Sequence, residues 1–319
     1  MSEVTTWPWL PTELIENIIS EVWSSSLSTN DRITLMTSSL LVNKTWMVAF
    51  TRISSKDVHI PCPSYIDQYL RILREESPIY DEHSRSLPDR LCRSLTFRVG
   101  YTPPGHDAAP SGNEPQMAKA LSDMMYTLHT ISYLPNLRRV SIEYVNWGFD
   151  DLFDQYRLIA FPAQVTNLEL DYTFSQKTPP WLIGALRSNQ ERHMCLPWSL
   201  PFIRHLSIQG AGEAFLIDMV SACPNIQSLT TDAYIRLGAI IPLPDAVQMV
   251  TLRESTSMPL TREGMDGYNL IPALDGAFFS VPTPTLKIVI ESGVPDAAVW
   301  DEYREMCGER GVQLIHRVL

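Results

Sequence analysis

The 319-residue chain lacks the features of several large classes of protein. It has no run of lysine or arginine, and its net charge of −11 and pI of about 5.1 argue against nucleic acid or an anionic membrane as a partner. No segment approaches the ~18 consecutive apolar residues of a membrane span, and the N-terminus has no signal-peptide pattern. We therefore expect an intracellular protein, cytoplasmic or nuclear.

Cysteine and the motifs of catalysis are also scarce. The five cysteines are far apart and include no C-x-x-C pair, which is typical of reduced thiols: Cys62, Cys92, Cys195, Cys223 and Cys307. The sequence contains no G-x-S-x-G, no P-loop and no H-E-x-x-H. Nothing in it supports catalysis by this chain, so we predict that it is not an enzyme and has no cofactor.

One segment has part of a dinucleotide-binding pattern. Gly210-Ala-Gly212-Glu-Ala-Phe215 follows an expected strand, opens an expected helix and is followed by Asp232. Phe215 stands where the third glycine is needed, and Glu213 would place negative charge where a pyrophosphate should bind. A turn between repeated elements is the better interpretation.

Metal ligands do not form a convincing set. Asp150, Asp151 and Asp154 cluster at the start of an expected helix, where capping and the helix dipole explain carboxylates equally well. His193 and Cys195 are zinc-ligand types without a second pair at useful spacing. We predict no metal site.

Residues 11 to 23 have the pattern of an amphipathic helix. Pro11 blocks a helix before it, Thr12 can cap one, and Glu13 and Glu16 lie in the first turn, where the helix dipole favours acidic residues. The apolar residues then fall on one helical face: Leu14, Ile15, Ile18, Ile19, Val22 and Trp23.

A second apolar set follows a polar, serine-rich connection from Ser24 to Asn30 and lies between Ile33 and Phe50. We expect residues 1–53 to form a small module of two or three short helices. A module this small needs a partner or a neighbouring domain to cover its apolar faces.

The pair Leu10-Pro11-x-Glu13-Leu14-Ile15-x-x-Ile18-Ile19 and Leu41-Val42-x-Lys44-x-Trp46 resembles the F-box, over about residues 8 to 53. Two positions depart from the family: Asn43 replaces the usual Cys or Ser, and Ser24 to Asn30 lengthens the first connection. The resemblance implies binding to a Skp-type adaptor of an SCF (Skp–cullin–F-box) ubiquitin ligase, through Leu10, Pro11, Leu14, Ile15, Ile18, Leu41, Val42 and Trp46. A helical cap on a larger domain remains the alternative.

Residues 54–319 repeat one short pattern. A turn, usually with proline, leads into an apolar-x-x-apolar-x-apolar core in which the last two apolar residues face inward from a strand. The clearest cores are Leu137-x-x-Val140-x-Ile142, Val165-x-x-Leu168-x-Leu170, Ile203-x-x-Leu206-x-Ile208, Ile226-x-x-Leu229-x-Thr231 and Val247-x-x-Val250-x-Leu252. Helix-like segments near 116–132, 150–160, 179–188, 213–222 and 296–307 lie among them.

This core resembles the leucine-rich repeat. The spacings between successive copies are 28, 38, 23 and 21 residues, and three of the four fall within the ~20–29 residues of that family. The family's Asn or Cys after the strand is missing, so we predict an α/β chain in which the helical module precedes an irregular solenoid of short parallel strands and helices. An open, doubly wound α/β domain gives the same alternation and remains the alternative.

Together the two resemblances imply a substrate-receptor subunit of an SCF-type ubiquitin ligase. The module would bind a Skp-type adaptor, and through it the cullin ligase, while the repeats would bind an unidentified protein target. Two other functions stay open: a leucine-rich-repeat scaffold without a ligase role, and an enzyme of open α/β type, which the broken glycine pattern disfavours.

Overall fold

The computed structural model describes residues 10–25, 27–77, 80, 85–100, 117–145, 161–174, 183, 199–232, 243–254, 261–276 and 286–318. Within these ranges the chain is an α/β protein with one nine-stranded sheet whose strands follow one another in chain order. Every neighbouring pair of strands is parallel. A doubly wound sheet reverses its strand order, so this alternative prediction is wrong.

The strands are short and similar in length. They are β1 (Asp57–Ile60), β2 (Ser94–Gly100), β3 (Arg139–Val145), β4 (Asn167–Thr173), β5 (His205–Gln209), β6 (Ser228–Asp232), β7 (Met249–Arg253), β8 (Lys287–Ser292) and β9 (Gln313–Val318).

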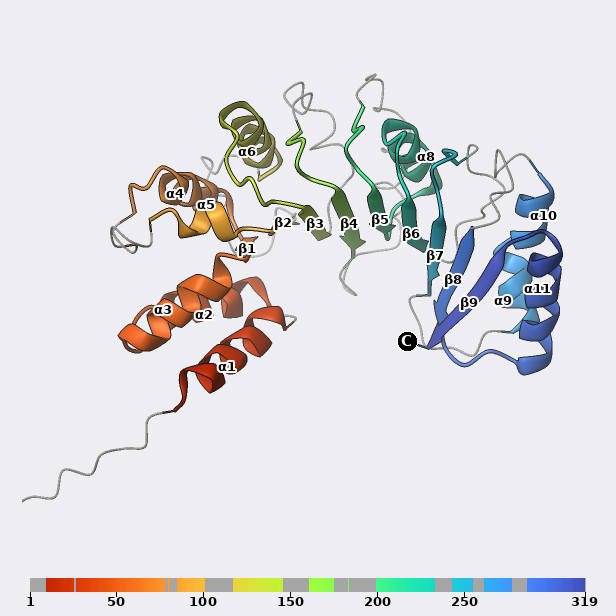
Figure 1. Cartoon of the computed structure of the whole chain (residues 1–319), viewed down its shortest axis with the longest axis horizontal. Coiled ribbons are helices and arrows are strands. Elements are labelled where there is room, and N and C mark those ends of the chain that lie inside the picture. The colour runs from red at the N-terminus through yellow and green to blue at the C-terminus, as the bar shows by residue number, and fades with distance from the viewer. Residues whose placement is uncertain are drawn as a thin grey trace, which may run out of the picture.

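The helices lie to one side of the sheet or at its N-terminal end. They are α1 (Thr12–Ser24), α2 (Thr29–Ser39), α3 (Lys44–Ser54), α4 (Pro63–Leu73), α5 (Leu87–Leu91), α6 (Met117–Ile131), α8 (Glu213–Ala222), α9 (Arg262–Gly267), α10 (Leu270–Asp275) and α11 (Ala297–Glu309). Figure 1 shows an arch: α4, α6, α8 and α11 cover the outer side of the curved sheet, and α1–α3 lie below β1 in this view. The inner, concave face of the sheet carries no helix among the described residues (Figure 1).

The predicted inward positions lie in one row across the sheet. Val140 pairs with Leu168, Leu168 with Leu206, Leu206 with Leu229, and Leu229 with Val250, and all five are at most 1% exposed. The prediction that they occupy equivalent sites on neighbouring parallel strands is confirmed. A period-two strand exposes one face and buries the other, so this row anchors the strands to the helices outside them.

A tight turn before the strand places the first apolar residue of each core. Leu137 N donates to Leu134 O at 2.9 Å, and Val165 N donates to Pro162 O at 3.0 Å. The same bond, from residue i+3 to residue i, leads into Ile203, Ile226 and Val247. These first apolar residues are buried beside the N-terminal ends of the strands, as the repeated pattern predicts.

Residues 57–60 and 93–99, which we expected to be strands from the sequence, are two further copies of the pattern. Ser55 precedes Val58 by three residues and Cys92 precedes Leu95 by three, and all four side chains are at most 3% exposed. Val58 pairs with Leu95, and Leu95 with Val140, so β1 and β2 continue the same row. Their match to the repeat core could not be predicted, because a serine and a cysteine occupy the position that is apolar elsewhere.

Helices α1, α2 and α3, called the helical unit below, have a small core of their own. Ile15, Ile19, Trp23, Ala49 and Phe50 form a buried cluster that is separate from the large cluster beneath the sheet. The observed bounds match the expectation of short helices up to residue 53, and the polar connection lies at residues 25–28. Trp23 joins the unit to the sheet, because its Nε1–H donates to Asp57 O at 2.8 Å.

Apart from residue 183, several predictions concern residues outside the described ranges: the helices at 150–160 and 179–188, the Asp150–Asp154 cluster, and the His193 and Cys195 pair. Helices expected near 116–132, 213–222 and 296–307 are present as α6, α8 and α11. Among the described helices, none combines the length and apolar character needed to cross a bilayer.

Candidate functional site

The helical unit leaves a set of large apolar side chains uncovered. Leu10 is 55% exposed, Leu14 47% and Ile18 44%, at successive four-residue steps along and just before α1. Leu41 and Val42, in the turn between α2 and α3, are 84% and 56% exposed. Single exposed apolar residues are normal, but a concentration of them on one small unit is typical of an interaction surface.

The eight residues predicted for adaptor contact divide into two groups. Leu10, Pro11, Leu14, Ile18, Leu41 and Val42 are exposed. Ile15, in contrast, belongs to the buried cluster, and Trp46 is partly buried and packs against it. The last two therefore hold the unit together from within, while the other six face outward.

Asn43, one of the departures from the F-box pattern, has a local role. Its side-chain Oδ1 accepts a hydrogen bond from Trp46 N at 2.9 Å, which caps the first turn of α3. Asparagine is among the preferred N-cap residues, so the substitution preserves the start of the helix.

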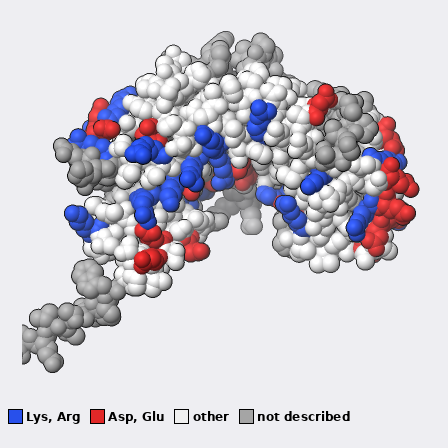
Figure 2. All heavy atoms as spheres, in the orientation of Figure 1, with Lys and Arg blue, Asp and Glu red and all other residues white. Residues whose placement is uncertain are grey.

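The second surface is the concave face, defined by the outward side chains of the nine strands. These residues are mostly polar because every second strand residue points away from the core. On β3 to β7 they include the hydroxyls of Ser141, Ser207, Ser228, Thr230 and Thr251. Figure 2 shows basic side chains gathered along the hollow of the arch, and acidic ones on the C-terminal helices.

Some charges on the concave face neutralise each other. Arg139 and Glu169, on neighbouring strands, form a two-bond pair at 2.8 and 2.5 Å. Arg253 donates to Glu291 at 2.8 Å, and Arg317 approaches the other oxygen of Glu291 at 3.4 Å. Both carboxylate oxygens of Glu169 and of Glu291 are thus already paired with arginine, so these two groups are poorly placed to bind a ligand.

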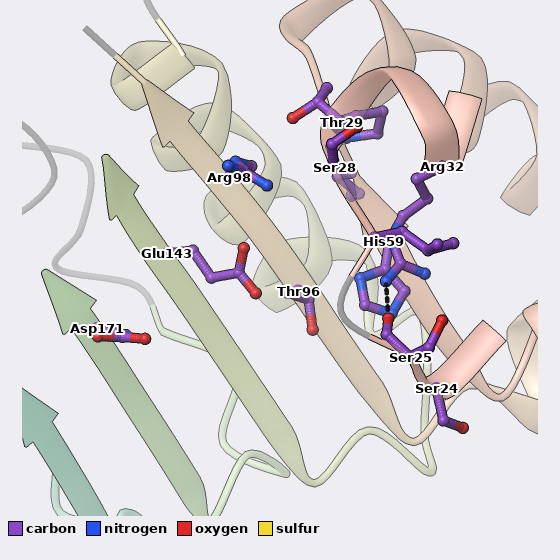
Figure 3. Close-up of a pocket in the computed structure, with 13 residues that line it drawn as sticks. Ser24, Ser25, Ser28, Thr29, Arg32, His59, Thr96, Arg98, Glu143 and Asp171 are labelled. Atoms are coloured by element: carbon purple, nitrogen blue, oxygen red, sulfur yellow. Dashed lines mark hydrogen bonds between the residues drawn. The ribbon is translucent and has the colours of Figure 1, made fainter. Parts of the chain in front are cut away.

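A pocket of about 510 Å³ lies where the helical unit meets the concave face, and we call it the junction pocket. Figure 3 shows strands β1 to β4 on one side and the end of α1 and start of α2 on the other. Charged side chains line it on both sides, with hydroxyl groups between them: Ser24, Ser25, Ser28, Thr29, Arg32, His59, Thr96, Arg98, Glu143 and Asp171.

Arg32 fixes the wall formed by the connection between α1 and α2. Its guanidinium donates to Trp23 O at 3.0 Å and to Ser25 O at 3.1 Å, and it lies 5.1 Å from the centre of the Trp23 ring. Burial lowers the pKa of Arg32, while Glu143 raises it and Arg98 lowers it. The charge of Arg32 thus belongs to a partly desolvated network that includes the strands.

His59 lies beside this network as a neutral ring. Burial, followed by the nearby charges of Arg32 and Arg139, lowers its pKa to about 3. Its ring packs edge-on against Trp23, with centroids 5.3 Å apart. At neutral pH His59 therefore adds no positive charge to the junction pocket.

Asp171 lies at the other end of the pocket. Burial raises its pKa, and the negative charges of Glu143 and Asp232 raise it further, against a smaller lowering by Arg253. A second pocket of about 460 Å³ continues along β3 to β7 and shares Glu143 and Asp171 with the first. The concave face therefore offers two adjoining polar pockets.

An apolar pocket of about 290 Å³ separates the helical unit from α4. Ile33, Met36, Leu40 and Phe50 line it from the unit, and Tyr65 lines it from α4. It shows that the two parts of the chain leave an incompletely filled apolar gap on the outer side of the junction.

The partial dinucleotide pattern serves the fold. Gly210 has a φ of +72°, and a Cβ there would lie 1.8 Å from Tyr172 O, so glycine is required by the approach of the neighbouring strand. Its N–H donates to Asp232 Oδ2 at 2.5 Å, and Phe215 is buried against Tyr172. In the described part of the chain no group of three or more His, Cys, Asp or Glu side chains could hold a metal ion.

Sequence reasoning missed the charged residues of the junction pocket. Arg98, Glu143 and Asp171 occupy the same register on β2, β3 and β4. Each follows the first inward strand residue by three positions, and that regularity was the sequence signal from which these charged residues could have been predicted.

Comparison with known proteins gives no matching family model and no matching curated protein.

Proposed function

We propose that the chain is the substrate-receptor subunit of an SCF-type ubiquitin ligase. In this proposal the helical unit is an F-box-like module that binds a Skp-type adaptor. The strands and helices that follow are irregular leucine-rich repeats whose concave face holds a protein target. Ubiquitin transfer would be carried out by other subunits, and the receptor would contribute by holding the target near them.

One observation carries the proposal: the helical unit turns apolar residues outward while it packs a separate core inward. Leu14 and Ile18 are exposed, whereas Ile15 and Ile19, next to them in the sequence, are at most 8% exposed. A helix that only capped the sheet would bury its apolar faces. Full burial of one Leu or Ile side chain contributes about 1.5–3 kcal/mol, so covering several partly exposed ones supports a stable complex.

The test is co-expression of the full chain with a Skp-type adaptor, followed by co-purification. We expect the wild-type chain to form a complex and Ile18→Glu to lose at least about tenfold in affinity, because a charge would be buried in an apolar interface. The matched control is Ile131→Glu at the end of α6, where isoleucine is 50% exposed, against 44% for Ile18. This control should bind the adaptor like the wild type.

A repeat scaffold without a ligase role is the second candidate. The bond from Trp23 to Asp57 O favours it, because it places the helical unit against β1, the first strand of the sheet. The scaffold is favoured if the folded wild-type protein does not bind the adaptor. It is also favoured if Ile18→Glu and Ile131→Glu bind the adaptor equally. Circular dichroism of each variant separates loss of binding from loss of folding.

A further inference from the structure

The junction pocket has a basic end and an acidic end. Arg32, on α2, and Arg98, on β2, lie nearest the helical unit, while Glu143 and Asp171 continue outward on β3 and β4 (Figure 3). Arg98, Glu143 and Asp171 are register partners on three successive strands. The sign of the charge therefore changes along one line across the strands.

Three of these charges interact with other charged groups in the described part of the chain only over longer distances. Arg98, Glu143 and Asp171 take part in none of its ion pairs or side-chain hydrogen bonds, although Arg139, Glu169, Arg253 and Glu291 on the same face are all paired. All three are partly buried. A half-buried charge without a partner is costly, and a ligand of opposite charge would remove part of that cost.

The polar connection between α1 and α2 forms the wall opposite the strands. Ser24, Ser25 and Ser28 line the pocket there, and Arg32 holds this wall in place through Trp23 O and Ser25 O. Trp23 is in turn bonded to Asp57 O on β1. The wall is thus fixed to the sheet before any ligand arrives, which lowers the entropy lost on binding.

We propose that the junction pocket binds an extended segment of the target protein that carries an acidic and a basic side chain. The acidic side chain lies against Arg98, in the positive field of Arg32, and the basic side chain lies against Glu143 and Asp171. The hydroxyl oxygens of Ser25 and Ser28 accept from backbone N–H groups of the segment, because these two hydroxyls already donate to Val22 O and Asp31 Oδ2. This inference deepens the proposed function and depends on it for the idea that the partner is a protein.

The spacing of the two charges follows from the sheet. Arg98 and Asp171 are two strands apart, which is roughly 9–10 Å at the usual separation of strands. A segment in the extended polyproline II conformation rises about 3.1 Å per residue with three residues per turn, so side chains three positions apart lie on the same side of it and span the same distance. The volume of about 510 Å³ lies within the ~300–1,000 Å³ of sites that enclose small ligands, so it can hold a few side chains of such a segment.

The experiment is a selection of displayed eight-residue random peptides on the full-length chain. We expect enrichment of peptides in which Asp or Glu stands about three residues from Lys or Arg, in one preferred order. The double variant Arg98→Asp with Asp171→Arg exchanges the two ends and should enrich the opposite order. Lys287→Glu, an exposed change on β8 of the same face, is the matched control and should select the wild-type pattern.

A selected peptide, made synthetically, then gives the affinity by fluorescence polarisation. We expect a loss of at least about tenfold for Arg98→Ala and for Asp171→Asn, which cover the case that the exchanged variant fails to fold. Equal selection by wild type and exchanged variant overturns the proposal. Peptides that need only their acidic residue and are displaced by inorganic phosphate overturn it too, because the site would then be a simple anion site.

Adaptor co-purification on the same variants separates this inference from the proposed function. Arg98 and Asp171 lie on β2 and β4, outside the helical unit, so the exchanged variant should bind the adaptor like the wild type. If the adaptor never binds but peptide order still reverses, the ligase role fails and the pocket stands as a scaffold's target site. If the adaptor binds and the peptide order does not reverse, only the pocket assignment fails.

Discussion

The helical unit and the sheet differ in how far their apolar side chains are exposed. Across the sheet, residues such as Leu168 and Leu206 are buried, and the alternate strand positions on the open face are polar. In the helical unit, Leu14 and Ile18 remain exposed beside a core of only five buried apolar residues, so apolar surface is left after its own core is complete.

This difference indicates which kind of partner suits each region. Covering an exposed apolar surface with another protein makes the free energy of binding more favourable, and this contribution depends on the shape of the two surfaces more than on their charge. A polar face with unpaired charges discriminates by sign and spacing. The two proposals therefore assign a constant partner to the helical unit and a selected segment to the concave face, and the following experiments test that contrast.

The largest effect should follow truncation in the inward row of the sheet. Leu206 is 1% exposed and has register partners on both sides, so Leu206→Ala leaves a cavity that costs about 2–5 kcal/mol. We expect the melting temperature in calorimetry to fall by roughly 3–8 °C. Phe202→Ala is the control, because Phe202 lies in the same repeat and is 50% exposed. Equal shifts for both variants would contradict the inward placement of Leu206.

A smaller difference should separate substitutions at two glycines that have the same backbone conformation. Gly210 and Gly311 have φ of +72° and +74°, but only at Gly210 would a Cβ collide with a neighbour, Tyr172 O. Gly311→Ala adds a left-handed alanine in open space, at a cost of about 1–2 kcal/mol. Gly210→Ala adds to this the movement of β4, or overpacking of about 1–3 kcal/mol.

Chemical denaturation of both glycine variants measures the difference. We expect Gly210→Ala to be clearly less stable than Gly311→Ala, because the packing of neighbouring strands, rather than the turn alone, requires glycine at residue 210. Equal losses would mean that β4 does not constrain the turn after β5.

The sheet could be predicted from the sequence because its rule is local. The spacing from Leu137 to Val140 and Ile142 specifies which side chains face inward, and the same spacing recurs wherever a strand must cover a helix. The rule failed at Ser55 and Cys92, where small residues fit the buried turn position as well as leucine does. Secondary structure was thus predictable wherever the pattern was complete.

The junction pocket was not predictable in the same way. Arg32 and Arg98 are 66 residues apart in the sequence and face the same space only because the helical unit packs against β1 through α3 and Trp23. That placement depends on the bond between Trp23 and Asp57 O and on the curvature of the sheet, neither of which leaves a repeated mark in the sequence. The charged residues of each strand could be identified in the sequence, but their position close to Arg32 could not be predicted.

The smallest effect should come from the exposed side of α1. Ile18 and Ile19 are neighbours of identical chemistry, yet Ile18 is 44% exposed and Ile19 is 3% exposed, within the cluster around Trp23 and Phe50. Ile19→Ala should destabilise the helical unit by about 2–5 kcal/mol, whereas Ile18→Ala should change stability by less than about 0.5 kcal/mol, since alanine also favours helix.

Amide hydrogen exchange along α1–α3 measures both changes, because it reports opening of this unit separately from the sheet. We expect faster exchange throughout the unit in Ile19→Ala and unchanged exchange in Ile18→Ala. If Ile18→Ala instead loosens the unit as much as Ile19→Ala does, then Ile18 is part of its core. Its exposure would then give no reason to assign that side of α1 to a partner, and the contrast between the two regions would disappear.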